Sequence, residues 1–195
     1  DQGMSLQTLR ENPSGVDLGP LQPMLPDRLC TPDKTITCNT PQPLADLSRL
    51  RDEFPSGFET NKVDESGSLK LIRRRHARSH NSWMHNYHRR MKGTPRCTLL
   101  IHPDDLAARR LDDGALITVT SRVGSLQVTA QASEEMMPGV VSLPHGFGHN
   151  RPGIRMHIAN QHAGVSCNDL TDEQFLDALS GNAAVNGVPV TVSAG

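Results

Sequence analysis

The sequence has few aromatic residues and no long apolar run. Its 195 residues include four Phe, one Trp and one Tyr, and hydrophobic residues make up 35% of the chain. A chain this lean in core-forming residues is expected to contain much loop or extended connector. No apolar stretch approaches the roughly 20 residues that cross a bilayer, and no signal-peptide pattern follows Asp1. We therefore predict no membrane segment in this chain and expect a fragment or a processed product.

Closely spaced cysteines and a strong net charge are also missing. No CxxC pair occurs, whereas zinc and iron–sulfur sites need clustered thiolates; the cysteines are Cys30, Cys38, Cys97 and Cys167. We predict reduced cysteines without a metal site and a cytoplasmic location, with a Cys30–Cys38 disulfide as a disfavoured alternative. The net charge of −1 excludes a globally basic nucleic-acid binder and leaves charge effects local.

Prolines are concentrated in the first third of the chain. Eight of the 14 lie in residues 1–66. Proline fixes φ and lacks a backbone donor, so it disfavours long helices and central strands there. Leucines at helical spacing predict one short helix at Pro43–Arg51. We predict that residues 1–66 form an extended connector arm from a preceding domain, and that residues 67–195 form a compact domain.

From Gly67 onward, short apolar runs alternate with glycine and proline. Two short helices are predicted, one starting at His102-Pro103 and one at Thr171-Asp172, because acidic residues follow a capping or proline position. Six short runs with little helix predict a mainly β chain that forms a small closed barrel. The runs are Leu69–Ile72, Thr98–Ile101, Ala115–Ser121, Leu126–Ala132, Val140–Leu143 and Val188–Val192.

Five segments of residues 67–195 resemble, in order, the C-terminal domain of the dimethyl sulfoxide reductase family, especially its formate dehydrogenase and nitrate reductase branch. They are LIRRRHARSHNSWMHN (71–86), HPDDLA with DDG (102–107 and 112–114), MPGVVSLPHGFGH (137–149), CNDLT (167–171) and NGVPVTV (186–192). The resemblance implies a six-stranded double-psi β-barrel with a few short helices that binds two molybdopterin guanine dinucleotides. It also implies that molybdenum or tungsten, the catalytic residues and any iron–sulfur cluster belong to upstream domains. No catalytic residue or metal ligand is therefore assigned to this chain.

The resemblance also implies a set of cofactor-binding residues. Family members usually show a glycine or threonine beside the first strand's arginine, whereas three arginines run together here, so which one faces phosphate stays open; motif position favours Arg73. The predicted cofactor-binding residues are Arg73, Arg74, Arg75, Ser79, His80, Asn81, Ser82, His145, Gly146, Phe147, Asn168 and Asn186.

The charge distribution suits this assignment. Between Ser66 and Pro103 there is no Asp or Glu, while nine of the 20 Lys and Arg residues fall there. Arginine forks bind phosphate bidentately, so the segment favours an anionic ligand.

Other interpretations of the same residues stay open. The arginines can form a solvated basic face. The histidine pairs His76/His80 and His85/His88 have metal-binding spacing but lie among arginines that repel a cation. His145 and His149 can be satisfied by backbone, and Asn168 can cap a turn.

The favoured function is therefore part of a molybdopterin-dependent oxidoreductase, with formate dehydrogenase ahead of nitrate reductase. The chain is predicted to be inactive alone, with the pterin cofactor and the upstream domains of its own polypeptide as partners. One alternative is a free-standing double-psi barrel that acts as an adaptor module without redox function. A second, nucleic-acid binding by the basic segment, lacks aromatic stacking residues, so no nucleic-acid partner is predicted.

Overall fold

The computed structural model describes residues 3–55 and 67–195. The chain divides into two units, Asp1–Leu47 and Ser48–Gly195. The first unit contains helix α1 (Leu6–Glu11), which begins where Ser5 Oγ accepts a hydrogen bond from Thr8 N at 3.1 Å. Helix α2 (Pro41–Glu53) spans the division and confirms the helix predicted at Pro43–Arg51. The predicted boundary between residues 66 and 67 stays a prediction, because residues 56–66 lie outside the described part.

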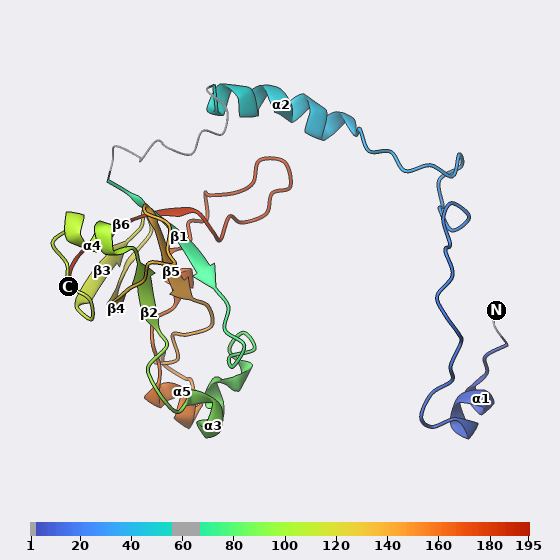
Figure 1. The fold of residues 1–195 in the computed structure, drawn as a ribbon, viewed down its shortest axis with the longest axis horizontal. Helices are drawn as coiled ribbons and strands as arrows, with labels where there is room; N and C mark the ends of the chain where they lie inside the picture. The colour runs from blue at the N-terminus through green and yellow to red at the C-terminus, as the bar shows by residue number, and fades with distance from the viewer. Residues whose placement is uncertain (1–2, 56–66) are drawn as a thin grey trace. The chain divides into compact units, whose positions relative to one another are not determined.

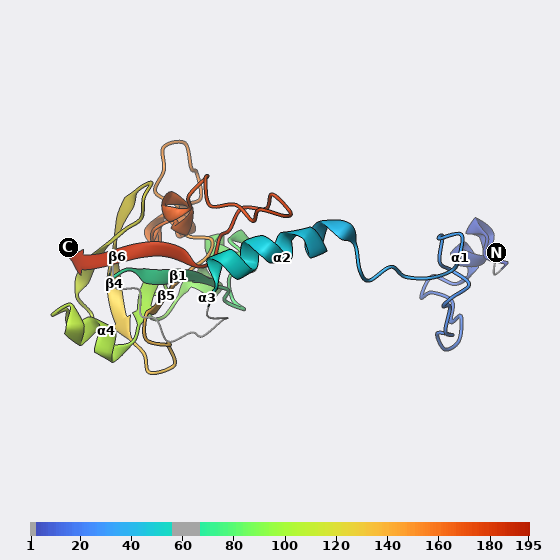
Figure 2. The ribbon, with the colours of Figure 1, turned by 90° about the horizontal axis from the view of Figure 1, so that it is seen from above.

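Six strands close into a barrel in the order β1–β5–β2–β4–β3–β6 (Figures 1 and 2). Each strand overlaps one of the predicted apolar runs, so the mainly β fold class and the closed barrel are confirmed. Closure pairs each of these strands on both sides. The strands are β1 (Leu69–Arg74), β2 (Thr98–Ile101), β3 (Leu116–Thr120), β4 (Ser125–Ala132), β5 (Val140–Pro144) and β6 (Val188–Ala194).

Two of the six strand pairings in this barrel are parallel, and they determine where the loops go. β1 runs parallel to β5, with Arg73 opposite Leu143 and Arg74 opposite Pro144. β2 runs parallel to β4, and the four remaining pairings are antiparallel. Because the carboxyl ends of β1 and β5 lie together, the segments that follow them leave the barrel at the same end.

The barrel interior is filled by aliphatic side chains. β4 shows why, since its buried residues Leu126, Val128 and Ala130 alternate with exposed ones. The core cluster contains Leu, Ile, Val, Ala and Cys167 but no aromatic residue, in agreement with the composition. Leu99 and Ile117 belong to it and are fully buried.

The connections of the described barrel domain carry five short helical segments. They are η1 (Trp83–Asn86), α3 (His88–Met91), α4 (Pro103–Ala108), α5 (His157–Gln161) and η2 (Cys167–Leu170). α4 is the helix predicted at His102-Pro103, with His102 Nδ1 accepting from Asp104 N at 3.1 Å. No described helix is long and apolar enough to span a membrane.

The helix predicted at Thr171-Asp172 is wrong. Thr171 ends η2 instead, and its hydroxyl donates to Cys167 O at 3.3 Å. The Asp172 carboxylate accepts from Gln174 N at 2.8 Å and from Arg122 Nη2 at 2.7 Å. Local turn bonds and a distant arginine thus occupy the groups that were expected to cap a helix.

We predict that Leu99→Ala lowers the free energy of unfolding by about 2–5 kcal/mol, because it leaves a cavity in a fully buried position. Leu116→Ala, on a strand of the same barrel but 55% exposed, is the control and should cost under about 0.5 kcal/mol. Urea unfolding of both variants measures the difference, and equal losses would contradict the packing described here.

Candidate functional site

Most of the residues predicted to bind a cofactor meet at one end of the barrel. The segment after β1 contains η1 and α3, and the segment after β5 contains α5. α3 and α5 contact each other beyond the ends of the two parallel strands (Figure 1). His145 N donates to Arg74 O at 3.0 Å, which continues the pairing of β1 with β5 into the loops.

The two loops touch through their backbones. Gly146 has φ +92°, and a Cβ at this position would lie 2.3 Å from Asn81 O. His80 and Asn81 also have positive φ, at 45° and 61°. Left-handed backbone in non-glycine residues is uncommon and is found where surrounding structure enforces it. This contact therefore needs glycine on one side and a constrained turn on the other.

A buried histidine pair lies behind this contact. His85 Nδ1 and His149 Nε2 are 2.7 Å apart, and the ring of Phe147 packs 4.4 Å from that of His85 between centroids. Burial and the nearby His149 lower the pKa of His85 to about 4. Burial also lowers the pKa of His149. Both rings are therefore neutral near pH 7, with one ring donating the shared hydrogen.

The sequence interpretation missed this pairing. It grouped His85 with His88 as a disfavoured metal pair and left His149 open between a backbone partner and a cofactor contact. Among residues 3–55 and 67–195, no three His, Cys, Asp or Glu side chains gather in a way that could hold a metal ion. The partners His85 and His149 lie 64 residues apart, so only the topology reveals them.

Two buried polar atoms of the loop after β1 lack hydrogen-bond partners within the described chain. They are Ser79 Oγ and His85 Nε2, in side chains that are 3% and 0% exposed. Most buried polar atoms in proteins are hydrogen-bonded, so these two atoms are candidates for contact with a bound ligand or water. Ser79 was predicted from sequence as a binding residue, whereas His85 was not.

The three consecutive arginines have different environments. Arg73 donates to Thr171 Oγ1, and its backbone N donates to Asn186 Oδ1 at 2.7 Å. Arg75 donates to the Asn81 side chain. Both arginines therefore connect elements of the predicted site.

Arg74 points into the barrel wall instead. Its guanidinium donates to Ser142 O on β5 and, at 2.7 Å, to Thr98 O on β2. Burial lowers the pKa of Arg74. Three strands are thus joined through one side chain, whose two Nη groups donate to protein acceptors.

The remaining predicted residues lie around the same loops. Ser82 precedes η1, and the Ser82 carbonyl accepts a hydrogen bond from His85 N at 3.1 Å. The rings of His80 and Trp83 meet edge to face. The N-cap of η2 is Ser166, whose Oγ accepts from Asn168 N at 3.3 Å. Asn168 therefore lies within this turn, and its side chain is exposed.

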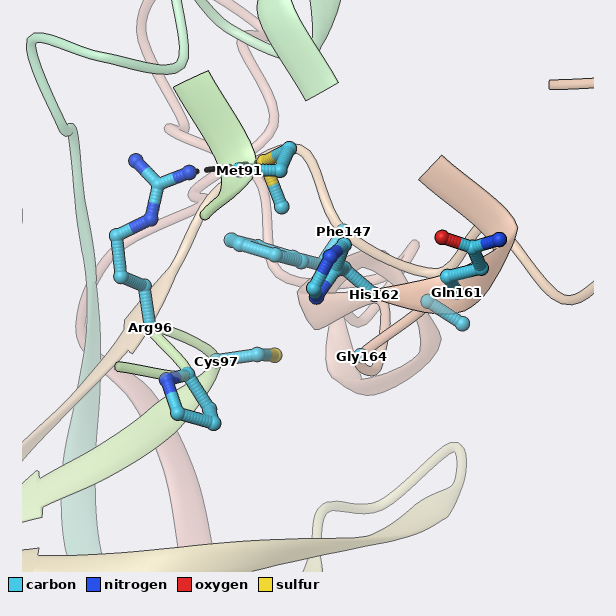
Figure 3. Close-up of a pocket in the computed structure, with 9 residues that line it drawn as sticks. Met91, Arg96, Cys97, Phe147, Gln161, His162 and Gly164 are labelled. Carbon is cyan, nitrogen blue, oxygen red and sulfur yellow. Dashed lines mark hydrogen bonds between the residues drawn. The ribbon is translucent and has the colours of Figure 1, made fainter. Parts of the chain in front are cut away.

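A cavity of about 260 Å³ opens beside Phe147, between the ends of α3 and α5 (Figure 3). Met91 and Phe147 give it apolar walls, while Arg96 lies at its side and donates to Met91 Sδ. Cys97 also lines it, and burial raises the pKa of this thiol. Sequence reasoning assigned only Phe147 of this lining, because the other residues lie on elements that the motif comparison did not cover.

Comparison with known proteins identifies the family of the barrel domain. Residues 69–189 match the family described as "Molydopterin dinucleotide binding domain". The chain belongs to this family. The match spans all five strands from β1 to β5 and the start of β6, and it confirms the resemblance to molybdopterin oxidoreductases. The chain is thus a molybdopterin dinucleotide-binding domain of the kind found in molybdoenzymes.

Two relatives illustrate the family. A tetrathionate reductase subunit from Salmonella typhimurium is 25% identical over 179 residues, an alignment that covers 78% of this chain and 16% of that protein. The structure of acetylene hydratase from Pelobacter acetylenicus aligns with a TM-score of 0.56 at 18% identity, covering 78% of this chain and 20% of the hydratase. The second likeness shows the fold, and in both cases the chain spans a small part of the relative.

We predict that Gly146→Ala is far more destabilising than Gly153→Ala. Both glycines have similar φ values of +92° and +87°, but a Cβ at Gly153 meets nothing within 4 Å. Gly153→Ala should cost about 1–2 kcal/mol for the left-handed backbone alone, and Gly146→Ala about 1–3 kcal/mol more for the clash with Asn81. Thermal or urea unfolding measures both. Indistinguishable variants would show that the two loops do not touch.

A second prediction concerns pH. The folded-state pKa of His85, about 4, lies below the unfolded value near 6.5, so the unfolded chain binds more protons between these pH values. The contribution of neutral His85 to the free energy of unfolding is therefore fully present above pH 6.5. It decreases as the pH falls toward 4, by up to about 3 kcal/mol. Urea unfolding at pH 7 and pH 4.5 should show this loss. The loss of stability between pH 7 and pH 4.5 should be smaller in His85→Gln, whereas the exposed control His88→Gln should lose as much as the unchanged chain. A smaller loss in His88→Gln than in His85→Gln would refute the assignment.

Proposed function

We propose that this chain binds molybdopterin guanine dinucleotide as one domain of a larger molybdenum or tungsten oxidoreductase that holds two such cofactors. The family match over residues 69–189 carries the proposal. Upstream domains of the same polypeptide would supply the metal ligand, the catalytic residues and any iron–sulfur cluster. When bound, the cofactor supplies the metal at which electrons or oxygen are transferred.

The residues present fit such a ligand. Ser79 Oγ and His85 Nε2 are buried polar atoms without protein partners in the described chain, and exposed Asn168 lies close in sequence to Thr171, which contacts Arg73. The glycine at 146 lets backbone approach backbone at the same end of the barrel. These loops would hold the polar edges of the cofactor, while Arg73 and Arg75 keep the CNDLT element and the Asn81 turn in place.

Formate dehydrogenase is the parent activity that we propose, on the basis of the arginine-rich segment and the Cys-Asn-Asp-Leu element. A second candidate is the reduction of a sulfur oxyanion, which the 25% identity to the tetrathionate reductase of Salmonella typhimurium favours. Assays of the full-length protein with formate and with tetrathionate distinguish them. We also propose a cytoplasmic location, from the scattered cysteines, and expect the chain alone to turn over neither compound.

We predict that the double change Arg73→Ala/Arg75→Ala in the full-length enzyme lowers its pterin and metal content. The guanidinium groups of Arg73 and Arg75 donate charge-assisted hydrogen bonds to Thr171 and Asn81, each worth about 1–3 kcal/mol, so the double change removes the contacts that hold these two parts of the site. The matched control is Arg110→Ala, an exposed arginine beyond α4. Pterin fluorescence and metal analysis give the occupancy. Full occupancy in the double variant, with the domain folded, would remove these arginines from the cofactor site.

A further inference from the structure

The cavity between the ends of α3 and α5 has the size and the walls of a small-molecule site. Its volume is about 260 Å³, and Met91 and Phe147 supply apolar surface (Figure 3). These two side chains are 5% and 9% exposed, so the cavity reaches into packed protein. Sites for drug-sized ligands have volumes of about 300–1,000 Å³, so this cavity suits a smaller ligand of about ten non-hydrogen atoms.

Arg96 brings a positive charge to the side of this cavity. Its Nη2 donates to Met91 Sδ at 2.8 Å and to Arg90 O at 3.0 Å, and its Nη1 lies 3.1 Å from His76 Nδ1. Within the described part of the chain Arg96 forms no ion pair. A thioether is a weak acceptor, so a carboxylate in the cavity is a stronger partner for this guanidinium than Met91 is.

The surroundings of Arg96 add positive charge and supply no acid from their own segment. Arg78 Nη2 donates to Arg89 O of α3 at 3.0 Å, which holds a second guanidinium near the cavity. Burial and this neighbouring Arg78 lower the pKa of Arg96. Residues 66–103 contain no Asp or Glu. An anion bound at Arg96 therefore offsets both the repulsion between the arginines and the loss of water around the charge.

The apolar walls favour an aromatic ring. Met91 presents a thioether, and contacts between sulfur and aromatic rings are favourable. Phe147 presents a ring, which pairs with another ring in an offset or edge-to-face arrangement. Gly164 closes one side of the cavity, where a Cβ would lie 2.8 Å from Phe147 Cδ1 and 2.7 Å from Cys97 Sγ. Glycine at this position therefore lets the backbone pack directly against both neighbours.

The thiol of Cys97 in the same wall does not oppose an anion. Burial raises the pKa of Cys97, so the side chain is neutral near pH 7. Its sulfur accepts a hydrogen bond from Val165 N at 3.3 Å, which fixes its position. Cys97 is partly exposed, and a molecule that fills the cavity is expected to shield it.

We propose that this cavity binds a small aromatic carboxylate, with the ring between Met91 and Phe147 and the carboxylate on Arg96. Inorganic phosphate has no apolar surface to cover these walls, and a neutral aromatic compound leaves the guanidinium with its thioether acceptor. The proposal does not depend on pterin binding. Phe147 is shared with the predicted cofactor-binding residues, but Met91, Arg96 and Cys97 are not among them.

The first test measures cysteine alkylation in the full 195-residue chain, with benzoate as the probe. Iodoacetamide is applied at mildly alkaline pH, and mass spectrometry gives the rate at each cysteine. Benzoate should slow the alkylation of Cys97 by about fivefold or more at saturation, because it covers the thiol. Half of this protection is expected at about 1 mM benzoate, a normal affinity for so small a ligand. The exposed Cys30 and Cys38 are internal controls whose rates should not change.

The second test compares ligands and variants by calorimetry. Acetate has the charge without the ring and benzyl alcohol the ring without the charge, so each should bind about tenfold or more weakly than benzoate. Arg96→Gln should weaken benzoate binding by about tenfold, and Arg96→Lys, which keeps the charge without the fork, should lie between it and the unchanged chain. Arg110→Gln, at an exposed arginine beyond α4, is the matched control and should bind like the unchanged chain. Thermal melts establish that each variant is folded.

Several results would overturn the proposal. They are unchanged alkylation of Cys97 in benzoate, equal protection of Cys30 and Cys38, and binding of acetate or benzyl alcohol as tight as that of benzoate. Equal affinity for benzoate in folded Arg96→Gln and the unchanged chain would also overturn it, as would an equal loss in Arg110→Gln. The alkylation and the ligand comparison need no variant, so they decide the question even if Arg96→Gln does not fold.

Discussion

The parallel pairing of β1 with β5 is the constraint on which the rest of this domain depends. Two strands that run side by side in the same direction must deliver their following loops to the same end of the barrel. The hydrogen bond from His145 N to Arg74 O carries the pairing one residue beyond the sheet. From there the close approach of Gly146 to Asn81, and then the buried pair of His85 and His149, follow by proximity. A site made from residues far apart in the chain thus rests on one strand register.

The strands were predictable because their signals are local. β2 was predicted with its observed bounds, and each of the others within about two residues at either end, because aliphatic residues alternate in these strands and turn residues flank them. The failed helix at Thr171 shows the limit of local signals. A threonine followed by acids is a good helix start, but Arg122, 50 residues away, binds Asp172 instead. The small helices η1, α3 and α5 are too short for periodicity to mark them.

The site was predictable only as a set of segments. The motifs identified the loops as parts of one site. In the structure Arg75 donates to the Asn81 side chain and the backbone N of Arg73 donates to Asn186, so residues from different motifs do meet. Which arginine of the run turns inward depends on the strand pleat and on acceptors such as Ser142 O, which a motif does not specify. Likewise, the pairing of His85 with His149 and the grouping of Arg78 with α3 require the tertiary fold.

The scarcity of aromatic residues has a spectroscopic consequence. Trp83 is the single tryptophan of the chain; it is 77% exposed and lies in η1, at the loop end of the barrel, while the aliphatic core contains no aromatic ring. Its fluorescence therefore reports on the solvent and contacts of η1 rather than on the state of the core. Emission from the native chain would serve as a built-in probe of whatever comes to lie against this end of the domain.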